Sequence, residues 1–174
     1  MLLSKSCRYA LRAMIFVASQ EPNGRPYLPI NRVSDALNIP FHFLTKVLQQ
    51  LTHDGLLVSI RGPAGGVALS RPAEEISVAD IVVSIEGPAL FHACVLGLEG
   101  CGNRIPCPLH DYWVEERERM RIDFETTSLR NLSENQDRIK HRLMDPEDPD
   151  ANLDPDRVVG RKAKARAKPA SAAS

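Results

Sequence analysis

Three cysteines and a histidine lie close together in the second half of the sequence. Cys94, Cys101 and Cys107 follow the spacing C-x6-C-x5-C, and His110 stands three positions after the last of them. Three thiolates and one imidazole suit either an iron–sulfur cluster (2Fe-2S first, 4Fe-4S second) or a zinc ion. The spacing lacks the CxxC pair that is typical of zinc sites, so it favours a cluster over zinc.

The residues around this loop leave alternatives open. Three glycines lie between the first and last cysteine and let the backbone wrap around a small object. Cys107-Pro108 matches the Cys-Pro step of iron–sulfur loops, and His92 and Glu99 are weaker alternative ligands. Without a metal, the segment is a flexible loop with three reduced thiols. Cys7 falls inside an expected helix, where a small core residue is the simplest interpretation.

Composition restricts the class of protein. The chain has 174 residues, of which 43% are apolar and 25% charged, as in an ordinary globular protein with a real core. It has neither a long apolar run nor an N-terminal stretch of signal-peptide type. Four cysteines without a secretory signal indicate a reducing compartment. We therefore expect a cytoplasmic protein without membrane contact.

The formal net charge of zero hides an uneven distribution. Residues 1–66 hold seven basic and three acidic residues, 67–156 hold nine basic and nineteen acidic, and 157–174 hold six basic and none acidic. The segments therefore carry about +4, −10 and +6. A basic first third is suited to a polyanion, although the charges would equally solvate separate faces.

The first seventy residues read as helix, helix, tight turn, helix, hairpin. Apolar residues at helical spacing predict helices over 6–19, 30–37 and 41–53. Two β-rich runs, 56–60 and 67–70, flank the glycine-rich segment 61–66 and predict a hairpin. This order is that of a winged helix-turn-helix, whose third helix enters the major groove. We predict a mainly α fold with a small β-hairpin wing, and double-stranded DNA as its partner.

The third helix and the wing supply the candidate DNA contacts. Polar side chains on the outer face of the third helix can reach base edges, and Lys46 and Arg61 can neutralise phosphates. The start of the first helix favours an anion through its backbone N–H groups. The candidate set is Ser4, Lys5, Arg8, Phe41, His42, Thr45, Lys46, Gln49, Ser59, Arg61, Gly62, Pro63, Gly65 and Gly66. The alternative is that the polar residues only solvate an exposed helix face.

The second part of the chain is expected to hold the metal site and a dimer helix. Ser77 to Asp80 reads as a capping box that opens a helix. After the cysteine loop, a charged C-terminal helix over 109–125 carries a thin apolar stripe, which favours packing against a second copy of itself or against its own domain. The stripe consists of Leu109, Trp113, Met120 and Phe124. The expected parts are a DNA-binding domain over 1–75, the loop and dimerisation region over 76–144, and a disordered acidic-then-basic tail over 145–174.

The sequence resembles the winged-helix transcriptional regulators of the IscR, NsrR and RirA type, the Rrf-two superfamily. The resemblance covers about residues 1–133. It is carried by the segment 8–14, by Ile39-Pro40 before the third helix, by 55–59 and, most specifically, by Arg61-Gly62-Pro63-Ala64-Gly65-Gly66. The three cysteines fit as well.

The resemblance implies a bacterial homodimer joined through the long helix, with a recognition helix in each major groove of a palindromic operator. It also implies that an iron–sulfur cluster held by the cysteines controls DNA affinity, in response to iron, cluster supply, nitric oxide or redox state. Two features depart from the family. The first cysteine interval is one residue longer than the common one, and Arg8 and Arg12 occupy positions from which some members' partner subunit supplies a ligand. His110 is therefore the expected fourth ligand.

Other functions fit less well. The same fold regulated by zinc or by thiol oxidation is the first alternative, and an iron–sulfur electron carrier or metal-delivery protein is a distant one. We expect no enzyme and no small-molecule substrate, because the sequence holds no nucleophile–base pair and the wing lacks the lysine and following helix of a nucleotide-binding loop. The operator, the signal and the choice between repression and activation do not follow from the sequence.

Overall fold

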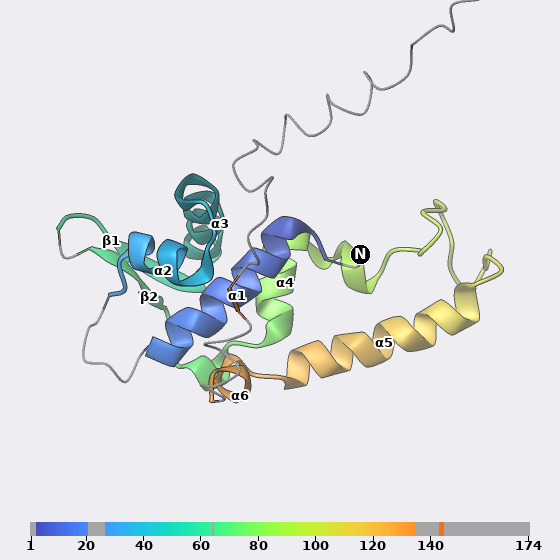
Figure 1. Cartoon of the computed structure of the whole chain (residues 1–174). Coiled ribbons are helices and arrows are strands. Elements are labelled where there is room, and N and C mark those ends of the chain that lie inside the picture. The colour runs from blue at the N-terminus through green and yellow to red at the C-terminus, as the bar shows by residue number, and fades with distance from the viewer. Residues whose placement is uncertain (1–2, 21–26, 64, 135–142, 145–174) are drawn as a thin grey trace, which may run out of the picture.

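The structure is a computed structural model that describes residues 3–20, 27–63, 65–134 and 143–144. Its elements follow the order expected for a winged helix (Figure 1). They are α1 Lys5–Gln20, α2 Ile30–Leu37, α3 Phe41–His53, β1 Leu57–Ile60, β2 Gly66–Leu69, η2 Ala73–Glu75, α4 Val78–Glu86, η3 Pro88–Phe91, α5 His110–Thr126 and α6 Leu129–Ser133. The predicted tail over 145–174 lies outside the described residues.

The turn between α2 and α3 is built from three residues of distinct type. Asn38 adopts the left-handed conformation with φ 52° and ψ 41°, which asparagine tolerates better than most residues. The Ser34 hydroxyl donates to the Ile39 carbonyl at 2.6 Å, and Ile39 itself is buried. Pro40 is the N-cap of α3, and proline disfavours a helical conformation in the residue before it. The predicted helix-turn-helix is confirmed.

The wing is a two-stranded antiparallel sheet. Leu57 pairs with Leu69 and Ile60 with Gly66. The first strand ends at residue 60 as predicted, and the other three strand ends lie one residue from the predicted ones. Val67 also exchanges backbone hydrogen bonds with Leu28, at 2.8 and 2.9 Å, which ties the hairpin to the segment before α2. The wing is therefore held against the helical part at its base.

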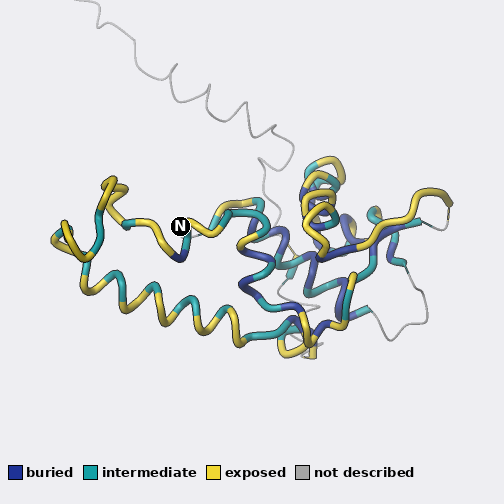
Figure 2. The backbone as a smooth tube through the Cα atoms, turned by 180° about the vertical axis from the view of Figure 1, so that it is seen from behind, coloured by how far each residue is buried: buried dark blue, intermediate teal, exposed yellow. Residues whose placement is uncertain are grey.

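The main core surrounds α1, which contacts α2, α3, α4, α6 and β2. Its largest buried side chains include Met14, Leu37, Leu44, Leu51 and Ile81. Figure 2 shows the buried backbone concentrated in these elements, whereas α5 carries no buried residue. No helix among the described residues is long and apolar enough to cross a membrane.

The apolar stripe of α5 turns towards its own chain. Met120 and Phe124 pack on a second cluster that includes Cys7, Val82 and Phe91, and the rings of Phe91 and Phe124 meet edge to face at 6.0 Å. These two residues follow the alternative interpretation of the stripe, contact with their own domain. A contact of the stripe with a second copy stays a prediction.

The capping box at the start of α4 is confirmed. The Ser77 side chain accepts from the Asp80 backbone N–H, and the Asp80 side chain accepts from the Ser77 N–H. Arg71 donates to the same carboxylate at 3.1 Å. A second capping box, formed by Ser128 and Asn131, opens α6.

Candidate functional site

The three loop cysteines come together at the N-terminal end of α5. Their sulfur atoms all lie within 4.8 Å of one another, and the Sγ atoms of Cys94 and Cys107 are 3.7 Å apart. A cavity of about 580 Å³ opens beside them. Converging thiols at this separation match the donor set that zinc or an iron–sulfur cluster requires.

His110 lies beside this group rather than within it. Its Nδ1 is 3.4 Å from the Cys101 Sγ, and its Nε2 is 3.3 Å from Asn103 Oδ1. Because α5 begins at His110, Cys107 precedes the helix and does not share a helical face with the imidazole. His110 and His92 both line the cavity, whereas Glu99 does not.

Two side chains of α5 donate hydrogen bonds to the backbone just before Cys94. The Trp113 Nε1–H donates to the Ala93 carbonyl at 2.9 Å. The Arg117 guanidinium donates to the same carbonyl at 3.1 Å and to that of His92 at 2.8 Å. Trp113 and Arg117 are one helical turn apart, so they act on one stretch of backbone. The sequence analysis missed Arg117, because a lone arginine in a charged helix gives no signal of such a contact.

The loop thiols differ in acidity. Hydrogen bonding to the Leu98 backbone is the main cause that lowers the pKa of Cys94 to about 7, against a smaller effect of desolvation. The backbone of residue 107 acts to lower the pKa of Cys101, but desolvation and the two neighbouring thiols outweigh it and raise that pKa. A thiolate is the metal-binding form of cysteine, so the lowered pKa of Cys94 favours metal binding by this thiol.

Cys7 belongs to the core, as expected. Its side chain is fully buried among α1 and α4 residues. Burial, reinforced by the nearby Glu86 carboxylate, raises the pKa of Cys7 to about 12. This thiol is therefore protonated at neutral pH and is separate from the loop thiols.

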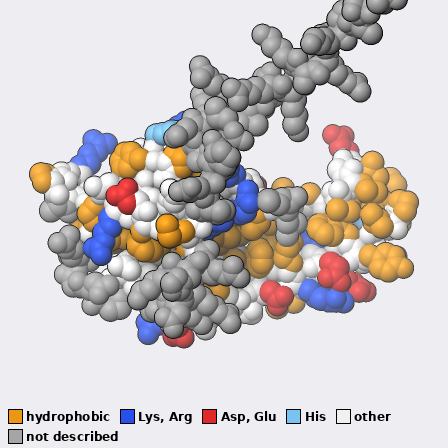
Figure 3. All heavy atoms as spheres, in the orientation of Figure 1, with side chains coloured by type: hydrophobic (Ala, Val, Ile, Leu, Met, Phe, Trp, Pro, Cys, Tyr) orange, Lys and Arg blue, Asp and Glu red, His pale blue; other side chains and the backbone are white. Residues whose placement is uncertain are grey.

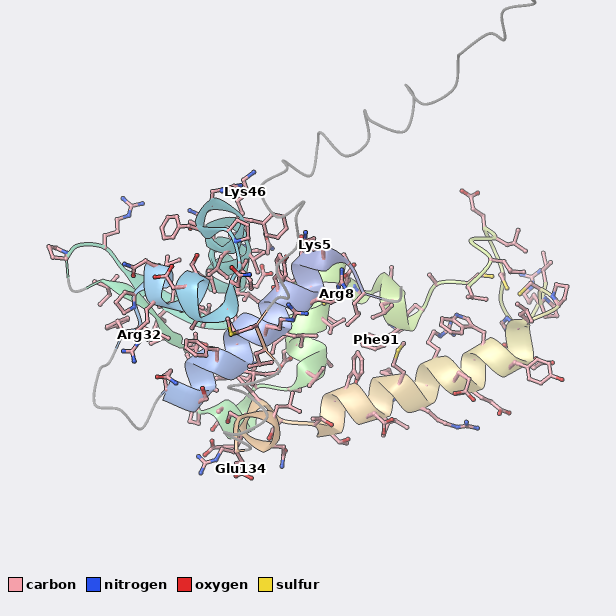
Figure 4. The ribbon with its side chains drawn as sticks, viewed as in Figure 1. Lys5, Arg8, Arg32, Lys46, Phe91 and Glu134 are labelled. Atoms are coloured by element: carbon pink, nitrogen blue, oxygen red, sulfur yellow. The ribbon has the colours of Figure 1, made fainter. Side chains whose placement is uncertain are left out.

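The outer face of α3 presents most of the predicted base-reading residues. His42, Lys46 and Gln49 are exposed, and Figure 4 shows Lys46 projecting from the outer side of this helix. Thr45 is half-buried, and its hydroxyl donates to the Phe41 carbonyl at 2.7 Å. Phe41, at the first position of α3, is 52% exposed.

A groove runs between α3 and the wing, with a volume of about 650 Å³. It brings together nine of the predicted DNA contacts, namely Phe41, Thr45, Gln49, Ser59, Arg61, Gly62, Pro63, Gly65 and Gly66. Pro29, Ile30, Asn31, Leu48, Thr52, Ile60 and Val67 complete the lining. Among the described lining residues Arg61 is the only charged one.

The glycines of the wing are required by the chain's own packing. A Cβ on Gly66 would overlap with the Leu28 carbonyl, and one on Gly65 would overlap with the Ile60 carbonyl. Gly62 has open space around it but a φ of +115°, which non-glycine residues rarely adopt. Gly62, Gly65 and Gly66 are therefore needed to build the turn, and their contact with DNA stays a prediction.

The start of α1 holds the remaining predicted contacts. The Ser4 hydroxyl accepts from the Cys7 N–H at 3.1 Å, and the Ser4 N–H donates to Glu86 at 2.8 Å. The anion at this helix start is thus a side chain of α4. Lys5 is exposed and lies over the Tyr9 ring at 5.6 Å, and Arg8 Nε is buried without a hydrogen-bond partner among the described residues. Figure 4 shows Lys5 and Arg8 near the start of α1.

Comparisons with known proteins agree with this architecture. Residues 3–135 match the family model Rrf2, described as an iron-dependent transcriptional regulator. The HTH-type transcriptional regulator IscR of Serratia proteamaculans (strain 568) is 31% identical over 137 residues, which cover 79% of this chain and 82% of that protein. IscR of Xenorhabdus nematophila is 32% identical over the same shares.

Solved structures give the same result. Staphylococcus aureus CymR superposes with a TM-score of 0.60 at 30% identity, covering 75% of this chain and 97% of that one. CymR of B. subtilis, described as the global cysteine regulator, reaches 0.64 at 27% identity, covering 75% and 95%. The chain therefore belongs to the Rrf2 family of winged-helix transcriptional regulators.

Proposed function

We propose that this chain is a homodimeric DNA-binding regulator whose affinity for a palindromic operator depends on an iron–sulfur cluster. The observation that carries the proposal is the convergence of the Cys94, Cys101 and Cys107 sulfurs within 4.8 Å at one end of the molecule. His110 would complete the set through Nδ1, with Asn103 holding the other ring nitrogen, as a partner of a ligating histidine usually does. Three thiolates and one histidine favour a 2Fe-2S cluster, with 4Fe-4S as the second possibility.

When bound, the cluster would supply redox chemistry and sensitivity to small oxidants. The chain's own residues would hold the cluster and position the loop that binds it. Trp113 and Arg117 fix the backbone before Cys94, and the loop places the thiols against the start of α5. A ligand shifts a conformational equilibrium only by the difference between its affinities for the two states. The cluster must therefore bind more tightly to one arrangement of the two recognition helices in the dimer.

The homodimer is supported by the surface at the loop end of α5. Figure 3 shows hydrophobic side chains gathered there. They are Val95, Leu96, Leu98, Ile105, Leu109 and Tyr112, which are between 45% and 76% exposed. Because an exposed apolar patch of this kind marks an interaction site, we assign it to the second copy, next to the outer face of α5.

The cluster is tested by anaerobic purification followed by an absorption spectrum with iron and sulfide assays. We expect visible absorbance with iron and sulfide in the wild type, its loss in Cys101→Ala, and its retention in the control Cys7→Ala, because Cys7 is buried in the core. A colourless protein without iron would overturn the cluster and favour zinc or thiol oxidation. The 3.7 Å between Cys94 and Cys107 supports the thiol alternative.

DNA binding is tested separately, on operators selected from random duplexes. Arg61→Ala should reduce affinity and lower the slope of log K against log salt by about one, since one phosphate contact is lost. Arg130→Ala is the control, because Arg130 of α6 pairs with Glu134 just after that helix, and Figure 4 shows Glu134 on the opposite side from Lys46. An unchanged salt slope in Arg61→Ala would contradict the assignment of the wing to the phosphate backbone.

A further inference from the structure

The recognition helix carries two different stripes on its outer side. His42 and Lys46 are exposed and form the polar stripe that points away from the wing, whereas Gln49 lines the groove between α3 and the wing. Phe41 and Thr45 lie on the flank that faces the wing, where both line the groove of about 650 Å³. The two stripes offer different chemistry to a DNA major groove.

The two threonines of the wing-side flank already donate their hydroxyl protons within α3. The one hydroxyl proton of Thr45 is donated to the Phe41 carbonyl of its own helix at 2.7 Å, so it is not available to a base. Thr52, farther along the same flank, donates to the Leu48 carbonyl at 2.8 Å in the same way. The γ-methyl is the part of the Thr45 side chain that can make an apolar contact.

Large apolar side chains stand on both sides of this groove. Phe41 on α3 is 52% exposed and Ile60 at the end of β1 is 50% exposed, and both line the groove. Arg61 is the only charged residue among its described lining residues, and Lys46 stands on the adjacent stripe. The groove thus combines an apolar wall with a positive rim, which suits an anionic partner that also presents an apolar group.

Duplex DNA has one such group in its major groove. Thymine presents a C5-methyl there, whereas the other bases present only hydrogen-bond donors and acceptors along with ring edges. Exposed phenylalanine and threonine methyl groups are the side-chain groups that contact it. Resting on the proposed DNA-binding function, we propose that Phe41 and Thr45 recognise the C5-methyl of a thymine in each half of the operator.

The two ways in which Thr45 can read a base make opposite predictions. If Thr45 contacts the thymine through its methyl group, Thr45→Val keeps the operator affinity. Thr45→Ser, which lacks the methyl, then weakens the affinity about fourfold per half-site. If the hydroxyl reads a base, the serine variant retains affinity and the valine variant loses it. Neither substitution changes the core, because Thr45 faces the groove.

The decisive measurement replaces thymine by deoxyuracil, which removes only the methyl group. Operators are selected from random duplexes with the anaerobically purified protein and again after chelator treatment, and each selected thymine is then exchanged in turn. We expect one thymine per half-site whose exchange weakens wild-type binding about fourfold and leaves Phe41→Ala binding changed less than twofold. His42→Ala, on the polar stripe, is the matched control and should keep the full sensitivity to uracil.

Failure of the inference is distinct from failure of the proposed function. Tight, sequence-specific binding that is insensitive to every uracil exchange, or that survives in Thr45→Ser but not in Thr45→Val, would overturn the inference and leave DNA binding intact. A wild-type protein that selects no sequence in either form would overturn both.

Discussion

Replacing Trp113 by phenylalanine should loosen the metal site without touching a ligand. The substitution keeps an aromatic ring but removes the Nε1–H that donates to the Ala93 carbonyl at 2.9 Å. A neutral hydrogen bond contributes about 1 kcal/mol net. Once it is lost, metal binding itself must order the backbone before Cys94, so the dissociation constant should rise about fivefold.

Arg117→Met should have the larger effect. It removes two hydrogen bonds from a charged donor, to the carbonyls of His92 and Ala93. Because the guanidinium is partly solvated, we discount these bonds to about 2 kcal/mol together. The dissociation constant should then rise about thirtyfold.

Titration of the metal-free chain with Co²⁺ under anaerobic conditions measures both constants, through the absorbance of cobalt thiolates. Arg121→Met is the control, since Arg121 stands one turn farther along α5 and contacts only Glu118 and Glu125 among the described hydrogen bonds. If all three variants bind cobalt as tightly as the wild type, the hydrogen bonds from Trp113 and Arg117 to the loop do not hold Cys94 in place.

Three further predictions concern the packing that supports the site. Gly66→Ala should destabilise the fold by about 1–3 kcal/mol, because the new Cβ overlaps with the Leu28 carbonyl; an unchanged melting temperature would contradict this packing. The Cys7 thiol, whose pKa is raised to about 12 by burial, should resist iodoacetamide in the native state while the loop thiols react, and equal labelling rates by mass spectrometry would refute its burial. Hydrogen bonds from Ser84, above all, lower the pKa of Asp54 to about 2, so the stabilisation from this carboxylate is complete above pH of about 4 and is lost as the pH falls towards 2. In Ser84→Ala, carboxyl NMR should find a higher Asp54 pKa, and an unchanged value would show that the bond is not the cause.

The helices and the wing could be predicted from sequence because their signals are local. Helical spacing, the Asn38-Ile39-Pro40 turn and the Ser77–Asp80 capping box each act within a few residues, and the structure confirms the elements that they predict. The cysteines could be recognised as a group because the loop that carries them is short.

The contacts that decide the chemistry of the site join residues far apart in the chain, so they could not be predicted from the sequence. Arg117 grips a carbonyl 24 residues before it in the chain, and Gly66 must be a glycine because of Leu28, far away in the sequence. Thr45 shows a different limit. Its type predicted a polar contact with a base, but an intrahelical hydrogen bond takes up its proton, a competition between side chain and backbone that residue type alone does not reveal.

A packed route connects the cysteine loop with the reading helix inside one chain. In the N-terminal half of α5, Trp113 and Arg117 donate hydrogen bonds to the loop backbone. Near the C-terminal end of α5, Phe124 packs on Phe91 and α4. From α4, the Ser84 hydroxyl donates to Asp54 at the end of α3 at 2.6 Å. We expect a change in the loop to reach α3 along these contacts, through the packing of α5 on α4 and the hydrogen bond from Ser84 to Asp54. We expect these close-packed helices to move as rigid bodies. An effect of the metal on DNA affinity should then be a displacement of the whole DNA-binding domains, which alters half-site spacing, rather than a local change in the residues that touch the bases.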